Sequence, residues 1–252
     1  PGRAARYTFA SGTIADNLTH TKNSQMGTAM TPSHGYWMGG YSSPPAVRYD
    51  QIQKFPFSSI NTQTDVGELA NHGIPGRPSV THLRHMASVT EEDTNAYTYG
   101  GLGDPYSFSN VVQKFPFASD VSASTTGATG LYVYGSATAS TETKAWLMGG
   151  DANPNSTGPF SLSSTNQIRS FNWASSGTMN DLGDLSENKG RFQGTSSPTY
   201  VYTQGGNRYG STPFYAGYGE KIAISSSTPI TATSHISTPG ASTYAAGQTV
   251  AN

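Results

Sequence analysis

Short runs of aromatic and β-branched residues recur along the whole chain, separated by segments rich in glycine, serine and proline. The chain holds 29 Gly and 15 Pro, which punctuate these runs at short intervals. Within the runs, apolar and polar residues alternate, and this period of two is typical of half-buried strands. No apolar run approaches the ~20 residues that a membrane span needs. The pattern therefore predicts an all-β fold made of many short strands.

An apolar pair spaced by two residues is the first landmark that recurs. QKFPF occurs twice, at Gln53–Phe57 and Gln113–Phe117. The pairs are Tyr7/Phe9, Phe55/Phe57, Phe115/Phe117, Phe171/Trp173 and Ile222/Ile224. Spacing of two places both side chains on one face of a strand. Proline cannot donate to a sheet ladder, so the two QKFPF strands are predicted to lie toward a sheet edge or to point that position outward.

A strand that ends in a glycine pair is the second landmark. These strands end at Gly40, Gly101, Gly150 and Gly206, with a decayed form that ends at Gln248. Glycine pairs allow a sharp turn with positive φ after the strand. Weaker strand signals lie between the landmarks: a small-residue run, and a leucine after a turn such as Asp65–Gly67. Each unit thus has four strands over roughly 40 to 60 residues, which is typical of a propeller blade.

The repeat resembles that of known proteins. A strand ending in Gly-Gly, then a loop, then an aromatic strand resembles the kelch repeat. The segment IQKFPFSS, followed by TDVGEL, is similar in sequence to repeats of proteins encoded by marine tailed phages. This resemblance implies a kelch-like β-propeller and a role as a virion component of the tail-fibre type.

Counting the landmarks predicts one domain over residues 1–252, a five-bladed propeller with four-stranded antiparallel blades. The repeat units fall near 6–40, 41–101, 102–150, 151–206 and 207–252. The N-terminal segment supplies a third and fourth strand, and residues 240–248 supply a first and second strand. Sharing one blade between the termini would close the ring and leave no long unpaired edge. The alternative is a fragment of a larger ring.

Composition narrows the function classes. Charged residues make up only 12%, the net charge is −1, and the 14 basic residues are scattered. Nucleic-acid binding needs clustered Lys and Arg, so no nucleic-acid partner is expected. With no Cys, the chain has no disulfide and no thiolate site. A charge-poor chain rich in Ser, Thr and Gly suits a virion surface or an extracellular location.

The loops that follow the glycine pairs are the candidate functional face. They are long, and long loops on a rigid scaffold usually carry function. Tyr and Arg anchor partners at interfaces, and Tyr with Asn or Asp suits the face and hydroxyls of a sugar. The predicted ligand-binding residues are Tyr41, Arg48, Tyr49, Asp104, Tyr106, Asn153, Asn155, Arg208, Tyr209 and Tyr215.

Other candidate chemistry is weak. His72, His82 and His85 are interpreted as surface histidines rather than metal ligands, and Glu91–Asp93 as a solvated acidic turn. No metal, cofactor or catalytic residue is predicted. Sialidase boxes, GxSxG and P-loop strings are missing. One enzyme alternative stays open, because Asp50, Asp104 and Asp151 could converge as glycoside-hydrolase carboxylates.

The sequence therefore predicts a non-catalytic structural and adhesion module of a phage virion, in a tail fibre, tail tip or capsid decoration. Its partners would be a host surface glycan or other virion proteins, bound in a multimeric assembly without membrane insertion. Many copies would raise a modest single-site affinity through avidity. Two alternatives are a secreted cellular lectin or extracellular filament subunit, and a glycan-cleaving propeller enzyme.

Overall fold

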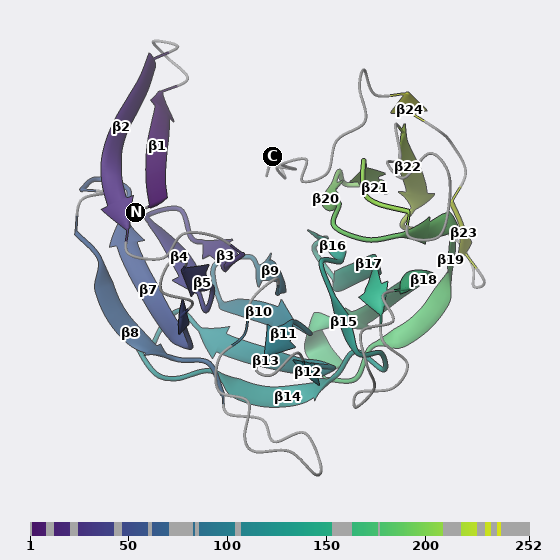
Figure 1. Ribbon diagram of the computed structural model, residues 1–252, viewed down its shortest axis with the longest axis horizontal. Helices are drawn as coiled ribbons and strands as arrows, with labels where there is room; N and C mark the ends of the chain where they lie inside the picture. The colour runs from purple at the N-terminus through teal and green to yellow at the C-terminus, as the bar shows by residue number, and fades with distance from the viewer. Residues whose placement is uncertain are drawn as a thin grey trace.

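The computed structural model shows an all-β molecule whose sheets follow one another in an arc (Figure 1). It describes residues 2–8, 13–20, 25–42, 47–59, 62–70, 83, 86–103, 107–152, 163–175, 177–208, 218–225, 230–232 and 236–237. Within these residues, three four-stranded sheets and one six-stranded sheet supply four blades in a β-propeller arrangement. The predicted fold class of antiparallel blades in a propeller is confirmed.

Each blade runs from an inner first strand to an outer fourth strand in chain order. Blade 1 contains β3 (Gly27–Met30), β4 (His34–Met38), β7 (Gln51–Pro56) and β8 (Thr64–Glu68). Blade 2 contains β9 (Ala87–Glu91), β10 (Asn95–Tyr99), β13 (Val111–Pro116) and β14 (Ser124–Ala128). Blade 3 contains β16 (Ala137–Ser140), β17 (Lys144–Ala152), β18 (Ser163–Asn172) and β19 (Asn180–Lys189). Blade 4 contains β20 (Gln193–Ser196), β21 (Tyr200–Gln204), β22 (Tyr218–Ala223) and β24 (Ile236–Ser237).

The shorter elements lie at the margins of the blades. Strand β15 (Val133–Tyr134) pairs with the end of β17, and β23 (Ile230–Thr231) runs parallel to the outer strand β19. Two hairpins, β5 (Tyr41–Ser42) with β6 (Val47–Arg48) and β11 (Leu102–Gly103) with β12 (Ser107–Phe108), stand in the loops after glycine pairs. A 3-10 turn, η1 (Trp173–Ser175), follows β18.

The predicted count of five blades was wrong, because the residues that the structure describes form four. A blade needs a glycine-pair strand and an aromatic-pair strand in one sheet, and four sheets combine the two. The strand that carries Tyr7, β1 (Gly2–Thr8), pairs with β2 (Thr13–His20) in a two-stranded sheet instead. The predicted C-terminal strands at 240–248 lie outside the described residues.

Aromatic pairs form the junctions between blades. The ring of Tyr36 in β4 lies 5.6 Å from Phe115 and 4.7 Å from Phe117 of the next blade. The same arrangement places Tyr97 of blade 2 against Phe171 and Trp173 of blade 3. These contacts confirm that a spacing of two aims both side chains at one face, and they place the largest core side chains between sheets.

Two separate features of the structure require glycine at the glycine pairs. Gly100 and Gly101 have φ of 59° and 109°, and the pairs at 39–40, 149–150 and 205–206 repeat these angles closely. The next blade also approaches here, because the N–H of Gly101 donates to the carbonyl of Val133 at 2.9 Å. A Cβ at Gly100 would overlap that carbonyl. Positive φ and close approach both exclude larger residues, which explains the recurrence of the motif.

Small residues in the inner strands allow these strands to lie close together. The hydroxyl of Ser88 in β9 accepts from the N–H of Thr28 and donates to its carbonyl, both at 2.8 Å. The hydroxyl of Thr138 in β16 donates in turn to the carbonyl of Ser88 at 2.9 Å. Serine and threonine at the centre of the molecule therefore link one blade to the next.

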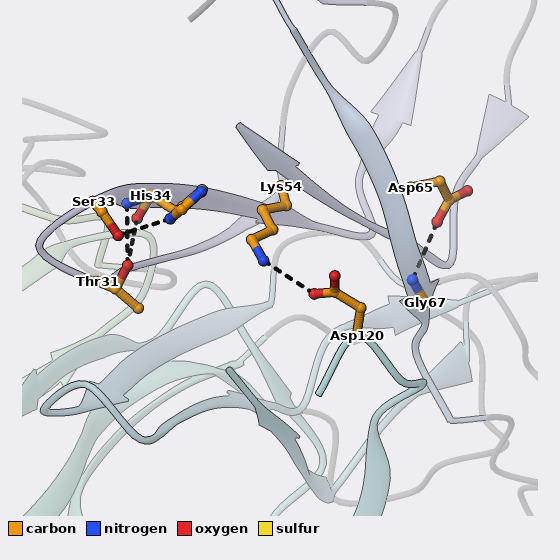
Figure 2. A network of polar contacts seen from close by, with 7 residues as sticks. All are labelled: Thr31, Ser33, His34, Lys54, Asp65, Gly67 and Asp120. Carbon is orange, nitrogen blue, oxygen red and sulfur yellow. Dashed lines mark hydrogen bonds and ion pairs between the residues drawn. The ribbon is translucent and has the colours of Figure 1, made fainter. Parts of the chain in front are cut away.

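The predicted turn at Asp65–Gly67 is instead a β-bulge inside the outer strand β8. The register between β7 and β8 shifts so that Ile52 faces Gly67 and Gln53 faces Asp65. The Asp65 carboxylate accepts from the N–H of Gly67 at 3.3 Å (Figure 2). A bulge kinks a strand and increases its twist, which explains why the motif reads as a turn.

The Gln and Lys side chains of QKFPF also make contacts between blades. The side-chain oxygen of Gln113 accepts from the N–H of Ala70 in the preceding blade at 2.7 Å. The ammonium of Lys54 reaches Asp120 of the following blade at 3.2 Å (Figure 2). Both proline residues end strands that are third of four. Pairing with the outer strands stops at Lys54 and Lys114, so the proline nitrogens point outward to an unpaired side, as the second predicted alternative requires.

Candidate functional site at the junction of blades 3 and 4

One backbone position just before the inner strands is left-handed in three blades. Gln25, Gly135 and Arg191 occupy it, with φ of 66°, 62° and 56°. Glycine adopts this conformation without cost, whereas other residues pay for it. An arginine held there, on the side where the glycine-pair strands end, is a strained residue that calls for a compensating role.

The Arg191 side chain is fixed by two partners from blade 3. Its Nε donates to the Asp151 carboxylate at 2.9 Å, and its Nη2 donates to the Tyr134 hydroxyl at 2.9 Å. The guanidinium also lies 5.6 Å from the centre of the Tyr134 ring. Its own N–H donates to the carbonyl of Gly135 at 2.6 Å. Arg191 is thus held at both its backbone and its guanidinium, and its side chain remains 24% exposed.

Two glycines make room for this arrangement. A Cβ at Gly135 would lie 3.1 Å from the Cγ of Arg191, and a Cβ at Gly190 would overlap the Asp151 carboxylate. Register pairing between β15 and β17 places Tyr134 directly opposite Asp151. The backbone around the ion pair is therefore shaped to accommodate it.

Asp151 is a fully buried carboxylate. Burial raises the pKa of Asp151 above its ordinary value, while the Arg191 guanidinium and hydrogen bonds from Arg191, Tyr134 and Ser164 oppose that rise. Its charge is compensated by an arginine, which is the usual condition for burying a carboxylate. Asp151 therefore positions Arg191 rather than facing solvent itself.

A second buried ion pair joins the same two blades. Lys189 of blade 3 and Glu220 of blade 4 are in contact, and both side chains are essentially inaccessible to solvent. The other oxygen of Glu220 accepts from the N–H of Ser186 at 2.9 Å. In the junction of blades 1 and 2 the corresponding residues are Leu83 and Gln113, both buried. The junction of blades 3 and 4 therefore has a charged pair where the junction of blades 1 and 2 has a leucine and a glutamine.

The third pair at this junction is more exposed. Arg208 follows the last glycine pair, and its Nη1 donates to the Glu187 carboxylate at 3.0 Å. Asn207 is almost fully buried, and its backbone exchanges two hydrogen bonds with Gly190. Among the described residues, three buried polar atoms of this region have no hydrogen-bond partner: the side-chain oxygen of Asn207, Oε1 of Glu187 and Nε of Arg208. Such atoms normally require a partner, which makes them candidates for contact with water or a ligand.

We name the side chains of this region the junction cluster. It comprises Tyr134, Asp151, Glu187, Arg191, Asn207 and Arg208. They come from the ends of β15, β17 and β19, the segment before β20 and the segment after β21. Backbone hydrogen bonds between Gly190 and Asn207 and between Arg191 and Gly135 tie the connecting segments together, so the cluster is held more firmly than a free loop would be.

The predicted site residues are only partly brought together. Tyr41 and Arg48 face each other in the β5–β6 hairpin of blade 1, and the Tyr49 hydroxyl lies 3.1 Å from that of Ser42. Arg208 belongs to the junction cluster instead. The remaining predicted residues, Asp104, Tyr106, Asn153, Asn155, Tyr209 and Tyr215, lie outside the described residues.

The other candidate positions can be placed in part. Glu91 in the acidic turn is not simply solvated, because its carboxylate accepts from Asn95 at 2.7 Å and from the Tyr97 hydroxyl at 3.0 Å. The histidines at 72, 82 and 85 lie outside the described residues. Within the described ranges, no group of three or more His, Cys, Asp and Glu side chains is placed to hold a metal ion. No helix in the same ranges has the length and apolar character to cross a membrane.

Sequence reasoning missed most of the junction cluster. Asp151 was noted only as a possible catalytic carboxylate, and Tyr134, Glu187, Arg191 and Asn207 carried no signal when read one at a time. An alignment of the repeat units on their glycine pairs would have shown that some of these residues are unusual at their positions. Arg191 then aligns with Gly135 of the preceding unit, and Lys189 aligns with Leu83 and Val133.

Comparisons with known proteins support the fold alone. No family model matches the chain, and neither does any curated protein sequence. The solved structure of YjhT is similar in three dimensions, with a TM-score of 0.61 and 13% sequence identity. The similarity covers 81% of this chain and 68% of the YjhT chain. At this identity the match establishes a β-propeller and leaves the ligand to be inferred from the site.

Proposed function

We propose that the protein is a non-catalytic binding module that presents a rigid propeller face to a host surface glycan or to a neighbouring virion protein. The observation that carries this proposal is the junction cluster. Charged and amide side chains gather there on the side where the glycine-pair strands end, and they are held in fixed orientations. Binding sites are typically built from polar groups placed precisely on a rigid scaffold.

The biological setting is part of the proposal. The resemblance of the repeat sequence to kelch-like phage proteins favours a component of a phage tail fibre, tail tip or capsid decoration. Such a component lies on the virion surface or in an extracellular location. Multiple copies in such an assembly would convert a modest affinity into firm attachment. A secreted lectin or filament subunit would use the same face, and the contents of purified virions distinguish these settings.

The surroundings of Asp151 favour binding over glycan cleavage. A glycoside hydrolase needs a second carboxyl group about 5 to 10 Å away across the scissile bond. Asp151 contacts the guanidinium of Arg191 and the hydroxyl of Ser164, and its carboxylate is buried. Such an environment suits a positioning role.

A glycan array probed with the full chain tests the proposed function. Retention of one or more glycans, with no release of reducing ends from the retained glycans, is the expected result. Purified phage particles analysed by mass spectrometry should contain the chain. Cleavage of a bound glycan would favour the enzyme alternative, and binding to no glycan and no virion protein would contradict the proposal.

A further inference from the structure

We propose that the junction cluster recognises the hydroxyl groups of an uncharged saccharide and that Arg191 is its specificity-determining residue. This inference rests on the proposed function and adds the ligand class and the location of the site. It moves the centre of binding from the loop tips to the seam between blades 3 and 4.

The balance of charge at the seam argues for an uncharged ligand. Arg191 is paired with Asp151, Arg208 with Glu187 and Lys189 with Glu220. Each cation therefore has its own carboxylate, and the three pairs together carry no net charge. Because each pair is neutral, the seam offers no net attraction to an anionic or a cationic ligand, whereas a neutral ligand does not depend on one.

The unpartnered atoms argue for hydroxyl groups. The side-chain oxygen of Asn207 and Oε1 of Glu187 are acceptors, and Nε of Arg208 is a donor. A hydroxyl group both donates and accepts, so a saccharide can satisfy both kinds of atom. The three residues lie side by side, because Asn207 directly precedes Arg208 and the Arg208 guanidinium donates a hydrogen bond to the Glu187 carboxylate.

Gln25 shares the left-handed backbone, so it is the strain together with the fixed guanidinium that argues for a function of Arg191. Gly135 occupies the same left-handed position in blade 3, so glycine satisfies the fold there. Keeping an arginine with φ of 56° costs stability, and such strain is characteristic of functional sites. Its partners Asp151 and Tyr134 orient the guanidinium in advance, which lowers the cost of ordering it on binding.

The test compares Arg191→Gly with Gln25→Gly, a matched control at the same left-handed position of blade 1. Both changes replace a polar side chain by the residue that the backbone prefers, and only the first alters the junction cluster. Arg191→Lys is the second test variant, since it retains the charge but lacks the planar fork. Binding is measured by titration calorimetry with neutral oligosaccharides from dextran, mannan and laminarin, and with acidic ones from alginate and carrageenan. Thermal unfolding of each variant reports whether it is folded.

The expected result is that the wild type binds a neutral oligosaccharide more tightly than any acidic one. Arg191→Gly and Arg191→Lys should then lose at least about tenfold in affinity, while Gln25→Gly stays within about twofold. Unchanged binding by both Arg191 variants, or a preference for acidic glycans, would overturn this inference and leave the proposed function in place. Binding of no glycan by the wild type would overturn the inference, and a virion-protein partner would then be the remaining form of the proposed function.

Discussion

At the scale of single residues, each letter of the repeated QKFPF has its own task. Gln113 reaches back to the N–H of Ala70, and Phe115 and Phe117 pack on Tyr36 of the preceding blade. Glu220 occupies the position of Gln113 in blade 4 and likewise accepts from a backbone N–H of the preceding blade. These contacts between blades explain the second copy. In the first copy Lys54 reaches the next blade, whereas Phe55 packs on Trp37 of its own blade.

Phe115→Ala should lower the free energy of unfolding by about 3–5 kcal/mol, because it leaves a cavity between two blades. Phe57→Ala is the control, since Phe57 is 36% exposed and its removal should cost much less. Urea unfolding followed by circular dichroism measures both. Equal losses in the two variants would mean that Phe115 does not fill a junction.

Asp151 should make the protein less stable as the pH rises. Burial raises the pKa of Asp151 above 3.8 in the folded chain, so the folded state retains its proton where the unfolded state has lost it. The stability that this group contributes therefore falls as the pH rises from about 3.8 through the folded pKa. The difference in free energy of unfolding between wild type and Asp151→Asn should decline as the pH rises above about 3.8. A difference that grows with pH would show that Arg191 outweighs burial.

At the scale of elements, the strands were predictable and their irregularities were not. Period-two alternation and the glycine pairs located β4, β10, β17 and β21 because both depend on a few neighbouring residues. The bulge at Asp65–Gly67 was read as a turn, since a bulge depends on the register with the neighbouring strand, which the chain alone does not reveal.

Gly100→Ala should destabilise the protein by more than about 2 kcal/mol. Alanine pays ~1–2 kcal/mol for the left-handed backbone at Gly100, and its Cβ would also overlap the Val133 carbonyl. Gly27→Ala in strand β3 is the matched control. A Cβ there meets its nearest neighbours at 3.5 Å, so the change should stay within about 1 kcal/mol. Thermal unfolding of the two variants checks the contrast, and similar losses would contradict the role given to the glycine pair.

At the scale of the whole molecule, repetition predicted the propeller but misjudged its count. Landmarks in the sequence mark strands, whereas a blade exists only where four strands pair, and β1 pairs with β2 alone. The loop-face site stays a prediction. Of its residues, Arg208 belongs to the junction cluster, whose other members depend on which blades meet.

Exchanging one junction for another should show that the blades are interchangeable modules. Lys189→Leu and Glu220→Gln should each cost about 3–5 kcal/mol, because each strands a buried charge. The double variant recreates the Leu83 and Gln113 pair of the junction between blades 1 and 2, and it should recover to within about 1–2 kcal/mol of wild type. Guanidinium unfolding of the three variants measures this coupling. Additive losses would indicate that the two side chains do not interact.

Hydrogen exchange of the full chain with and without a neutral oligosaccharide tests the central claim most directly, because it reports which face of the propeller binds. The account predicts slower exchange at residues 134–135, 187–191 and 207–208, around the junction cluster. The turns on the opposite side of the blades, at 31–34 and 57–59, should exchange as before. Protection confined to those turns, with none at the junction of blades 3 and 4, would contradict the account.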